Sequence, residues 1–417
     1  MPSQNQPHHP SRPTSSTGNP YLAVLRRPGA WQFSAAGAVA RLPMSMVGIA
    51  IVLMVQGQTG SYAQGGRVSA AYIVTQAICS PQIARLVDRH GQSRVMRPLV
   101  VLTSLAMLGF MLAATTRAPE PVLWALAVLI GATVGSVGSL VRARWNHVLD
   151  DGRALHTAYS LESAVDELVF VIGPVLATML ATSVHPAAGL LVPMLGAGLG
   201  GWWFLAQRGT EPPPRPVVVG ARTRTVLADP AMVALVAVFV AVGGVFGGID
   251  VATLAFAEER GHRSAAGLLL AGFALGSLLA GLGYGLRHWR SGAVTRLVVT
   301  TALLAGGVAL FFTVSTLWAL APVMFVTGFT IAPTLITGNN IVQIVVADHQ
   351  LTEGLTWLGT AIGVGVSVGT SVVGAVTDAH GAHRGYGVCV GAAAAAFLLS
   401  LAFFALVRRR RRTSPGA

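Results

Sequence analysis

The chain has 417 residues, of which 53% are hydrophobic and only 10% are charged. Soluble domains carry about 25% charged residues, so this composition excludes an ordinary soluble globular protein. The formal net charge is +13, and all 28 basic residues are arginines that lie in short segments between apolar runs. That distribution favours control of membrane topology over nucleic-acid binding, and we expect no nucleic-acid partner.

Twelve apolar runs are long enough to cross about 30 Å of hydrocarbon as helices. We therefore predict an all-α membrane protein with 12 transmembrane helices, embedded in a lipid bilayer. The two cysteines, Cys79 and Cys389, lie inside apolar runs, so we expect neither a disulfide framework nor a metal site. The predicted spans are 33–56, 66–84, 98–116, 121–141, 158–182, 187–206, 230–256, 264–286, 295–313, 317–340, 355–377 and 386–407.

The arginines predict the orientation of these spans. With the N-terminus in the cytoplasm, 22 arginines lie on the cytoplasmic side, five lie outside, and Arg41 remains within the first span. The positive-inside rule then predicts that both termini are cytoplasmic. The lysine-free composition, rich in Ala, Gly and Val, is typical of a GC-rich bacterial genome, so we expect a multi-pass protein of the bacterial inner membrane.

A polar stretch and a weak repeat divide the chain into two halves. A shift of 197 residues lays GATVGSVGSLVRARW (131–145) on GFTIAPTLITGNNIV (328–342) without a gap. Parallel repeats of this kind predict two pseudo-symmetric six-helix bundles around a central path. The predicted parts are an N-terminal tail that is disordered and then juxtamembrane (1–32), bundles at 33–206 and 230–407, a cytoplasmic linker (207–229) and a basic tail (408–417).

The loop between the second and third spans reads ARLVDRHGQSR (84–94). With Asp88, Arg89, Gly91 and Arg94 it resembles the loop signature of the major facilitator superfamily, although an alanine replaces the leading glycine. The resemblance implies a transporter that binds a small-molecule substrate, works as a monomer and needs no cofactor.

Asp88 could latch the two halves by accepting hydrogen bonds from a helix N-terminus or by pairing with an arginine. A merely topogenic basic loop is the alternative. The matching loop of the second half (285–292) has no Asp, so this latch is expected on one side only.

The fifth span contains Gly173 and Pro174 in VFVIGPVLA. This pair resembles the Gly-Pro helix signature of the superfamily's proton-driven exporters, and it favours export. A generic kink, with glycine allowing close helix packing, explains the same residues.

The same span carries three carboxylates, Glu162, Asp166 and Glu167, where ionisable groups are costly and are functional candidates by default. Arg41 and Asp166 both lie about eight residues into their spans, so we expect them at the same depth. One interpretation is a structural ion pair between Arg41 and Asp166, with Glu162 pairing with Arg142 or Arg144 near the cytoplasmic mouth. That leaves Glu167 as a third carboxylate near two others. Our hypothesis is that Asp166 or Glu167 binds the coupling proton and that Arg41 releases it when the site reorganises. A carboxylate here could equally hold a cationic substrate.

Four polar residues of the second half are candidates for substrate binding. Asp250 is predicted near the outer end of the seventh span, where a solvated helix end is an equal alternative. Asn339, Asn340 and Gln343 end the tenth span opposite Arg142 and its neighbours in the repeat, and helix capping explains them equally well. Trp145 and Trp357 are read as interface or packing residues.

Two glycine motifs mimic enzyme signatures but lie inside predicted spans. GAGLGG (196–201) and GVSVG (365–369) have no strand before them, so we interpret both as helix-packing glycines. Without a nucleotide-binding loop, energy must come from a proton gradient, and we expect no enzyme activity. The prediction is a proton-coupled exporter of a small organic compound, such as a drug or secondary metabolite. The alternatives are a proton-coupled uptake symporter for a metabolite or sugar and, last, a receptor or scaffold without flux.

Overall fold

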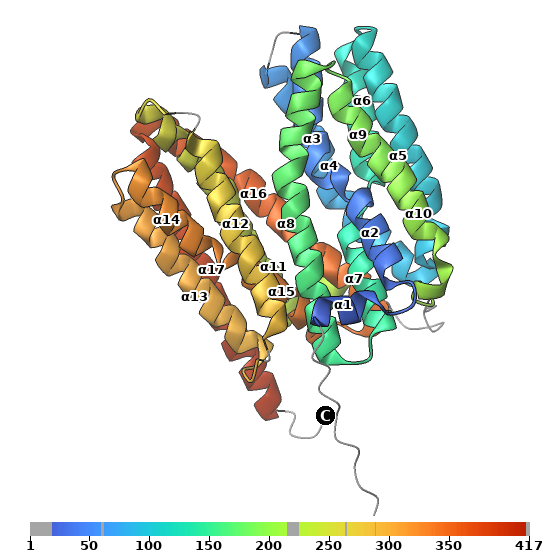
Figure 1. Cartoon of the computed structure of the whole chain (residues 1–417), viewed down its shortest axis with the longest axis vertical. Coiled ribbons are helices and arrows are strands. Elements are labelled where there is room, and N and C mark those ends of the chain that lie inside the picture. Colours follow the sequence, from blue (N-terminus) through green and yellow to red (C-terminus); the bar gives the residue numbers. More distant parts are fainter. Residues whose placement is uncertain (1–18, 60–61, 215–224, 263–264, 288, 414–417) are drawn as a thin grey trace, which may run out of the picture.

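The computed structural model describes residues 19–59, 62–214, 225–262, 265–287 and 289–413. Its regular elements are all helical, and they form two six-helix bundles that stand side by side in Figure 1. Parts of the predicted tails and linker, residues 1–18, 215–224 and 414–417, lie outside the described residues. In this described part, 11 helical segments are long and apolar enough to cross a membrane. The twelfth span is α4 (Tyr62–His90), whose 29 residues are more polar.

The first bundle follows a short helix, α1 (Pro20–Leu25). Its first span is split into α2 (Ala30–Ala40) and α3 (Leu42–Thr59), and its fourth into α6 (Glu120–Thr133) and α7 (Val137–Val148). The other spans are α4, α5 (Gln92–Thr115), α8 (Gly152–Ser183) and the sixth span, in which five π-helical residues (Gly196–Gly200) separate α9 (Ala188–Leu195) from α10 (Gly201–Ala206).

The second bundle repeats this plan with fewer interruptions. Its tenth span is split into α14 (Leu317–Gly328) and α15 (Ile331–Val345), near the place that matches the α6–α7 break. The other spans are α11 (Pro230–Glu259), α12 (Ala265–Leu286), α13 (Ala293–Thr313), α16 (Leu351–His380) and α17 (Ala382–Thr413).

Every predicted span coincides with a helix or a pair of helices, which confirms the predicted fold class. The helices extend beyond the apolar runs because a helix continues into polar sequence past the hydrocarbon. The interruptions were not predicted. At the α6–α7 break, Gly135 has a φ of 63° and a Cβ there would meet the Met96 side chain at 3.0 Å, so this backbone requires glycine.

The glycines of GAGLGG (196–201) and GVSVG (365–369) lie at close contacts between helices, as expected. A Cβ on Gly200 would come within 2.7 Å of the backbone of Ala40, so the sixth span packs tightly against α2. A Cβ on Gly365 would lie 2.0 Å from the carbonyl oxygen of Val240, and one on Gly369 would lie 2.2 Å from that of Gly244. Small residues therefore let α16 and α11 approach backbone to backbone.

The two bundles contact each other mainly through α8 with α12 and α4 with α16. These contacts lie toward the end of the molecule where α4, α10 and α12 end and α5, α8, α13 and α16 begin; we call it the basic end. In Figure 1 the axes of α8 and α12 approach each other there, close to α1, and diverge toward the opposite end. The basic end carries Arg85, Arg89, Arg94, Arg97, Arg144, Arg153, Arg208, Arg287, Arg290 and Arg296.

Close packing of α11 and α16 predicts opposite outcomes for two glycines of α16. Gly365→Ala pushes a methyl group into the Val240 carbonyl, and overpacking of this kind costs about 2 kcal/mol. Gly363→Ala is the matched control, because its Cβ meets nothing within 4 Å. Thermal unfolding of the purified proteins in detergent, followed by tryptophan fluorescence, should show a lower midpoint for Gly365→Ala only. Equal midpoints would contradict the packing argument.

Candidate functional site

The first span is interrupted at Arg41, which lies between α2 and α3 with 1% of its surface exposed. Two glycines allow close packing beside it, since a Cβ on Gly37 would lie 2.4 Å from Val141 Cγ2 and one on Gly138 would lie 3.2 Å from Arg142 Nη1. A charge buried this deeply requires carboxylate partners, because desolvation of a lone guanidinium is prohibitive.

Two carboxylates one turn apart on α8 supply these partners. Arg41 Nη2 forms a close ion pair with Glu162, and its Nη1 lies 3.0 Å from Asp166 Oδ1. The expected contact between Arg41 and Asp166 is therefore present, as their similar depth in the two spans indicated. Glu162 is fully buried, whereas 22% of the Asp166 side chain is exposed.

The expected partners of Glu162 were wrong. Arg142 Nη2 lies 2.7 Å from Asp166 Oδ2, so Asp166 bridges two arginines. Among the described arginines, only Arg41 forms an ion pair with Glu162. The α6–α7 break places Arg142 inside the bundle, whereas its position in the sequence indicated the mouth. Arg144 points elsewhere and donates to Gln92 at 2.8 Å and to the backbone carbonyl of Gln207 at 2.9 Å.

Two residues that sequence reasoning missed complete the surroundings of Glu162. Ser34 Oγ and Trp145 Nε1 each donate to Glu162 Oε1 at 2.7 Å. Trp145 is fully buried, so the reading of it as a packing residue was incomplete. A carboxylate held by an arginine, a hydroxyl and an indole has little freedom to move, which marks Glu162 as the fixed counter-ion of Arg41.

Glu167 faces a different direction from its two neighbours. Its Oε1 accepts a hydrogen bond of 2.6 Å from Ser277 on α12, a helix of the second bundle. The cluster therefore has three carboxylates for two arginines, and the surplus negative charge lies at the boundary between the bundles. This geometry matches the expected division between a paired Asp166 and a surplus Glu167.

The loop motif takes part in one of the two contacts between the bundles. Asp88 Oδ2 accepts a 3.0 Å hydrogen bond from the backbone N–H of Glu353, in the first turn of α16. Beside it, Arg85 lies 2.8 Å from the Glu353 carboxylate. The expected bond between Asp88 and a helix N-terminus is therefore present, where the helix dipole favours an anion.

Other motif residues shape the turn from α4 to α5. Gly91 has a φ of 89°, a backbone conformation that glycine adopts without strain. Arg94 is exposed at the start of α5, and Arg89 follows Asp88 near the end of α4. Both arginines lie at the basic end, where they contribute to its charge.

The second contact, between α8 and α12, was not predicted. The end of α12 has no aspartate, but its backbone carbonyls act as acceptors instead. His156 Nε2 lies 3.1 Å from the carbonyl oxygen of Tyr284, and Thr157 donates to that of Gly285 at 3.1 Å. His156 Nδ1 also lies 3.0 Å from the amide of Asn340. Backbone carbonyls, rather than an aspartate, accept the bonds that His156 Nε2 and Thr157 make in this second contact.

Helix α1 strengthens this second contact. The hydroxyl of Tyr21 donates to the backbone carbonyl of Leu282 near the end of α12. Burial raises the pKa of Tyr21 to about 12, so the phenol keeps its proton and remains a donor near neutral pH. A helix outside the bundle thereby ties the N-terminal segment to the second half.

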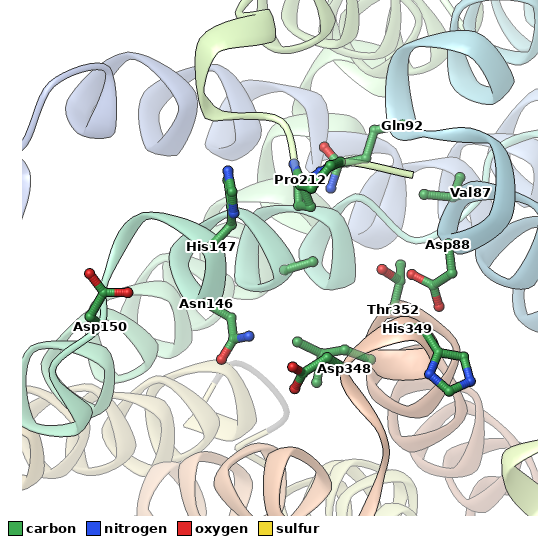
Figure 2. Close-up of a pocket in the computed structure, with 13 residues that line it drawn as sticks. Val87, Asp88, Gln92, Asn146, His147, Asp150, Pro212, Asp348, His349 and Thr352 are labelled. Carbon is green, nitrogen blue, oxygen red and sulfur yellow. The ribbon is translucent and has the colours of Figure 1, made fainter. Parts of the chain in front are cut away.

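A small polar cavity of about 240 Å³ lies next to the α4–α16 contact. Figure 2 shows Asp88, Thr352 and His349 on one side of it, and Asn146 and His147 on the other. Despite these polar groups, the described residues contain no set of three His, Cys, Asp or Glu side chains that could hold a metal ion. We therefore assign no metal or cofactor to this cavity.

The Gly173–Pro174 pair lies where α8 packs against α3. A Cβ on Gly173 would come within 2.0 Å of Ser45 Oγ, so only glycine permits this approach. Ser45 donates to the backbone carbonyl of Val169 at 2.9 Å, next to the carbonyl of Phe170 that Pro174 leaves without its helical donor. The Gly173–Pro174 pair therefore fixes the contact of α8 with α3, the helix that directly follows Arg41.

The remaining candidates lie apart from the charge cluster. Asp250 has an exposed side chain on α11, which ends at Glu259. Asn339 is half-buried, and Asn340 belongs to the α8–α12 contact. Gln343 is partly buried, and its Nε2 has no hydrogen-bond partner among the described residues.

These features define a helical multi-pass membrane protein whose two bundles hold a buried charge cluster and meet at one end. The chain belongs to the Major Facilitator Superfamily, whose family profile matches residues 33–343. It therefore has the fold of this superfamily's transporters. Comparison with curated proteins gives no match.

Solved structures of transporters share this fold at low identity. The human organic anion transporter MFSD10 (TETRAN) is 15% identical with a TM-score of 0.70, and the match covers 92% of this chain and 100% of that one. A bacterial homologue of the iron transporter ferroportin, in the outward-facing state, is 14% identical with a TM-score of 0.75 over 90% and 99% of the chains. A variant of the E. coli fucose:proton symporter FucP is 13% identical with a TM-score of 0.69 over 92% and 99%.

The contacts at the basic end predict that Asp88→Asn combined with Glu353→Gln opens this end. The amide side chains weaken these charge-assisted hydrogen bonds by about 1–2 kcal/mol in total, so the open population should rise roughly 5- to 30-fold. Spin labels at Gly152→Cys and Gly292→Cys report it, since a Cβ at either site meets nothing within 4 Å. Electron–electron resonance should then show longer distances between the labels.

The background for this measurement replaces Cys79 and Cys389 with alanine. Asp150→Asn is the control, because Asp150 is exposed at the same end and outside both contacts. Unchanged distances in the double variant would remove the latch role of Asp88.

Proposed function

We propose that the protein is a proton-coupled secondary transporter that exports a small organic compound by alternating access. The observation that carries the proposal is the buried cluster of two arginines and three carboxylates, with its surplus carboxylate bonded across the boundary to Ser277. Buried ionisable groups in a membrane are costly to retain without a role in ion or substrate movement.

The cluster suggests a division of roles among the carboxylates. Glu162 has three side-chain donors around it and serves as the fixed counter-ion. Asp166 is partly exposed and bridges Arg41 and Arg142, so a proton on Asp166 would release Arg142 for new partners and leave Arg41 paired with Glu162. We assign the coupling proton to Asp166 or Glu167, with Arg41 driving its release when the site reorganises.

The position of Glu167 connects the proton to the conformational change. Its bond to Ser277 joins the two bundles close to the α8–α12 contact. A protonated Glu167 loses the charge that strengthens this bond, which favours separation of α8 from α12. Proton binding and opening of the basic end are thereby coupled through one residue, as alternating access requires.

The orientation and setting follow from the arginines. We infer that the basic end faces the cytoplasm, with both termini there, in a bacterial inner membrane. The described contacts between the bundles close that end. We further infer bundles at 33–206 and 230–407, a linker at 207–229, and function as a monomer.

The direction of transport is the less supported half of the proposal. Export rests on the Gly173–Pro174 pair and its close packing against Ser45. Proton-coupled uptake is the alternative, because the same fold occurs in a fucose:proton symporter. Flux in proteoliposomes under an imposed pH gradient, scored for direction across a compound panel, separates the two. A receptor or scaffold would give no flux with any gradient or compound.

Two substitutions test the proton sites. Asp166→Asn and Glu167→Gln remove titratable groups at little change in size, so pH-driven transport should fall by roughly tenfold or more in at least one of them. Exchange of labelled for unlabelled substrate without a gradient should continue, because it needs no net proton movement.

The control is Glu120→Gln, because Glu120 is exposed and pairs with Arg67 only at 3.8 Å. Full pH-driven transport in both Asp166→Asn and Glu167→Gln would refute the assignment. Loss of exchange as well as pH-driven transport would indicate a binding role instead.

A further inference from the structure

A second region of concentrated charge lies at the basic end, away from the charge cluster. It is a groove of about 630 Å³ between the α4–α5 turn and the chain that leaves α10, and we call it the linker groove. Its lining residues are His90, Gly91, Ser93, Arg94, Arg97, Arg208, Glu211 and Pro212 to Pro214. Three guanidinium groups thus surround one groove.

These arginines lack carboxylate partners. Within the described residues, no carboxylate oxygen lies within 4.0 Å of Arg94, Arg97 or Arg208. Arg97 donates from Nη2 to the backbone carbonyl of Leu205 at 2.9 Å, but its buried Nε has no partner there. Like charges gathered in this way favour a bound anion.

The one acidic residue of the groove is already engaged. Glu211 accepts a 2.8 Å hydrogen bond from the backbone N–H of Ser93 and a second bond from the Ser93 hydroxyl. The carboxylate therefore caps the first turn of α5. The groove keeps a net positive charge, since one carboxylate cannot balance three guanidinium groups.

Aromatic residues place the groove at the level of lipid headgroups. Trp202 and Trp203, near the end of the sixth span, are 51% and 41% exposed. Exposed tryptophans at the end of a span are typical of the membrane–water interface. The guanidinium of Arg97 lies 5.6 Å from the centre of the Trp202 ring, so the charge lies beside the same interface.

We propose that the linker groove binds the phosphate of an anionic phospholipid headgroup. Guanidinium groups recognise phosphate oxygens through paired N–H donors, and basic pockets beside membrane spans bind such headgroups. The bound phosphate neutralises Arg94, Arg97 and Arg208 and holds the linker against the start of α5. Free phosphate offers the same chemistry, and the interface position favours the lipid. The proposal is independent of substrate and direction.

Native mass spectrometry of the full chain in detergent tests this site. The probes are phosphatidylglycerol, phosphatidylcholine of the same acyl chains, and inorganic phosphate. Phosphatidylglycerol should bind at least roughly tenfold more tightly than phosphatidylcholine, because each basic residue near an anionic lipid contributes about fivefold. The triple variant Arg94→Gln, Arg97→Gln, Arg208→Gln should lose this preference.

A second triple variant separates a built site from general charge. Arg153→Gln, Arg287→Gln, Arg290→Gln removes three exposed arginines from the same end and should keep the preference. Equal loss in both triple variants would overturn the proposal, and so would an unchanged preference in the first. If inorganic phosphate bound as tightly as phosphatidylglycerol and displaced it, the lipid assignment would be wrong. Circular dichroism confirms that each variant is folded.

Discussion

The structure depends on one buried guanidinium. Arg41 lies at a helix break with almost no exposed surface, and it is tolerable there only because two carboxylates reach it. That requirement fixes which face of α8 turns inward and how deep it lies, and it brings Arg142 in through Asp166. Glycines at 37 and 138 permit the close packing around the cluster, because a Cβ there would crowd Val141 and the Arg142 guanidinium, respectively.

The three carboxylates of α8 differ in surroundings although they lie within six residues. Glu162 is enclosed by donors, Asp166 is shared by two arginines and reaches the surface, and Glu167 bonds a hydroxyl of the other bundle. A single helix thus places three carboxylates in three different settings. Environment separates their roles, as it does for paired carboxylates in enzyme sites.

Much of the fold could be predicted because hydrocarbon thickness dictates the length of each apolar run. Counting residues into two spans also predicted the contact of Arg41 with Asp166. The partner of Arg142 was missed because a helix break, not the count, determines where that side chain lies. Trp145 and His156 were missed for another reason. Their hydrogen-bond partners are distant in sequence, and the spacing of tryptophan or histidine residues does not predict which partner they bind.

The α4–α16 contact has an uneven dependence on amino-acid identity. Asp88 contributes a side chain, whereas Glu353 contributes its main-chain N–H as well as its carboxylate. Substitution of Glu353 can remove the ion pair with Arg85, but every residue except proline keeps the backbone N–H that Asp88 binds. The receiving surface on α16 is therefore robust to mutation, and evolutionary change in the strength of this closure falls on the α4 side.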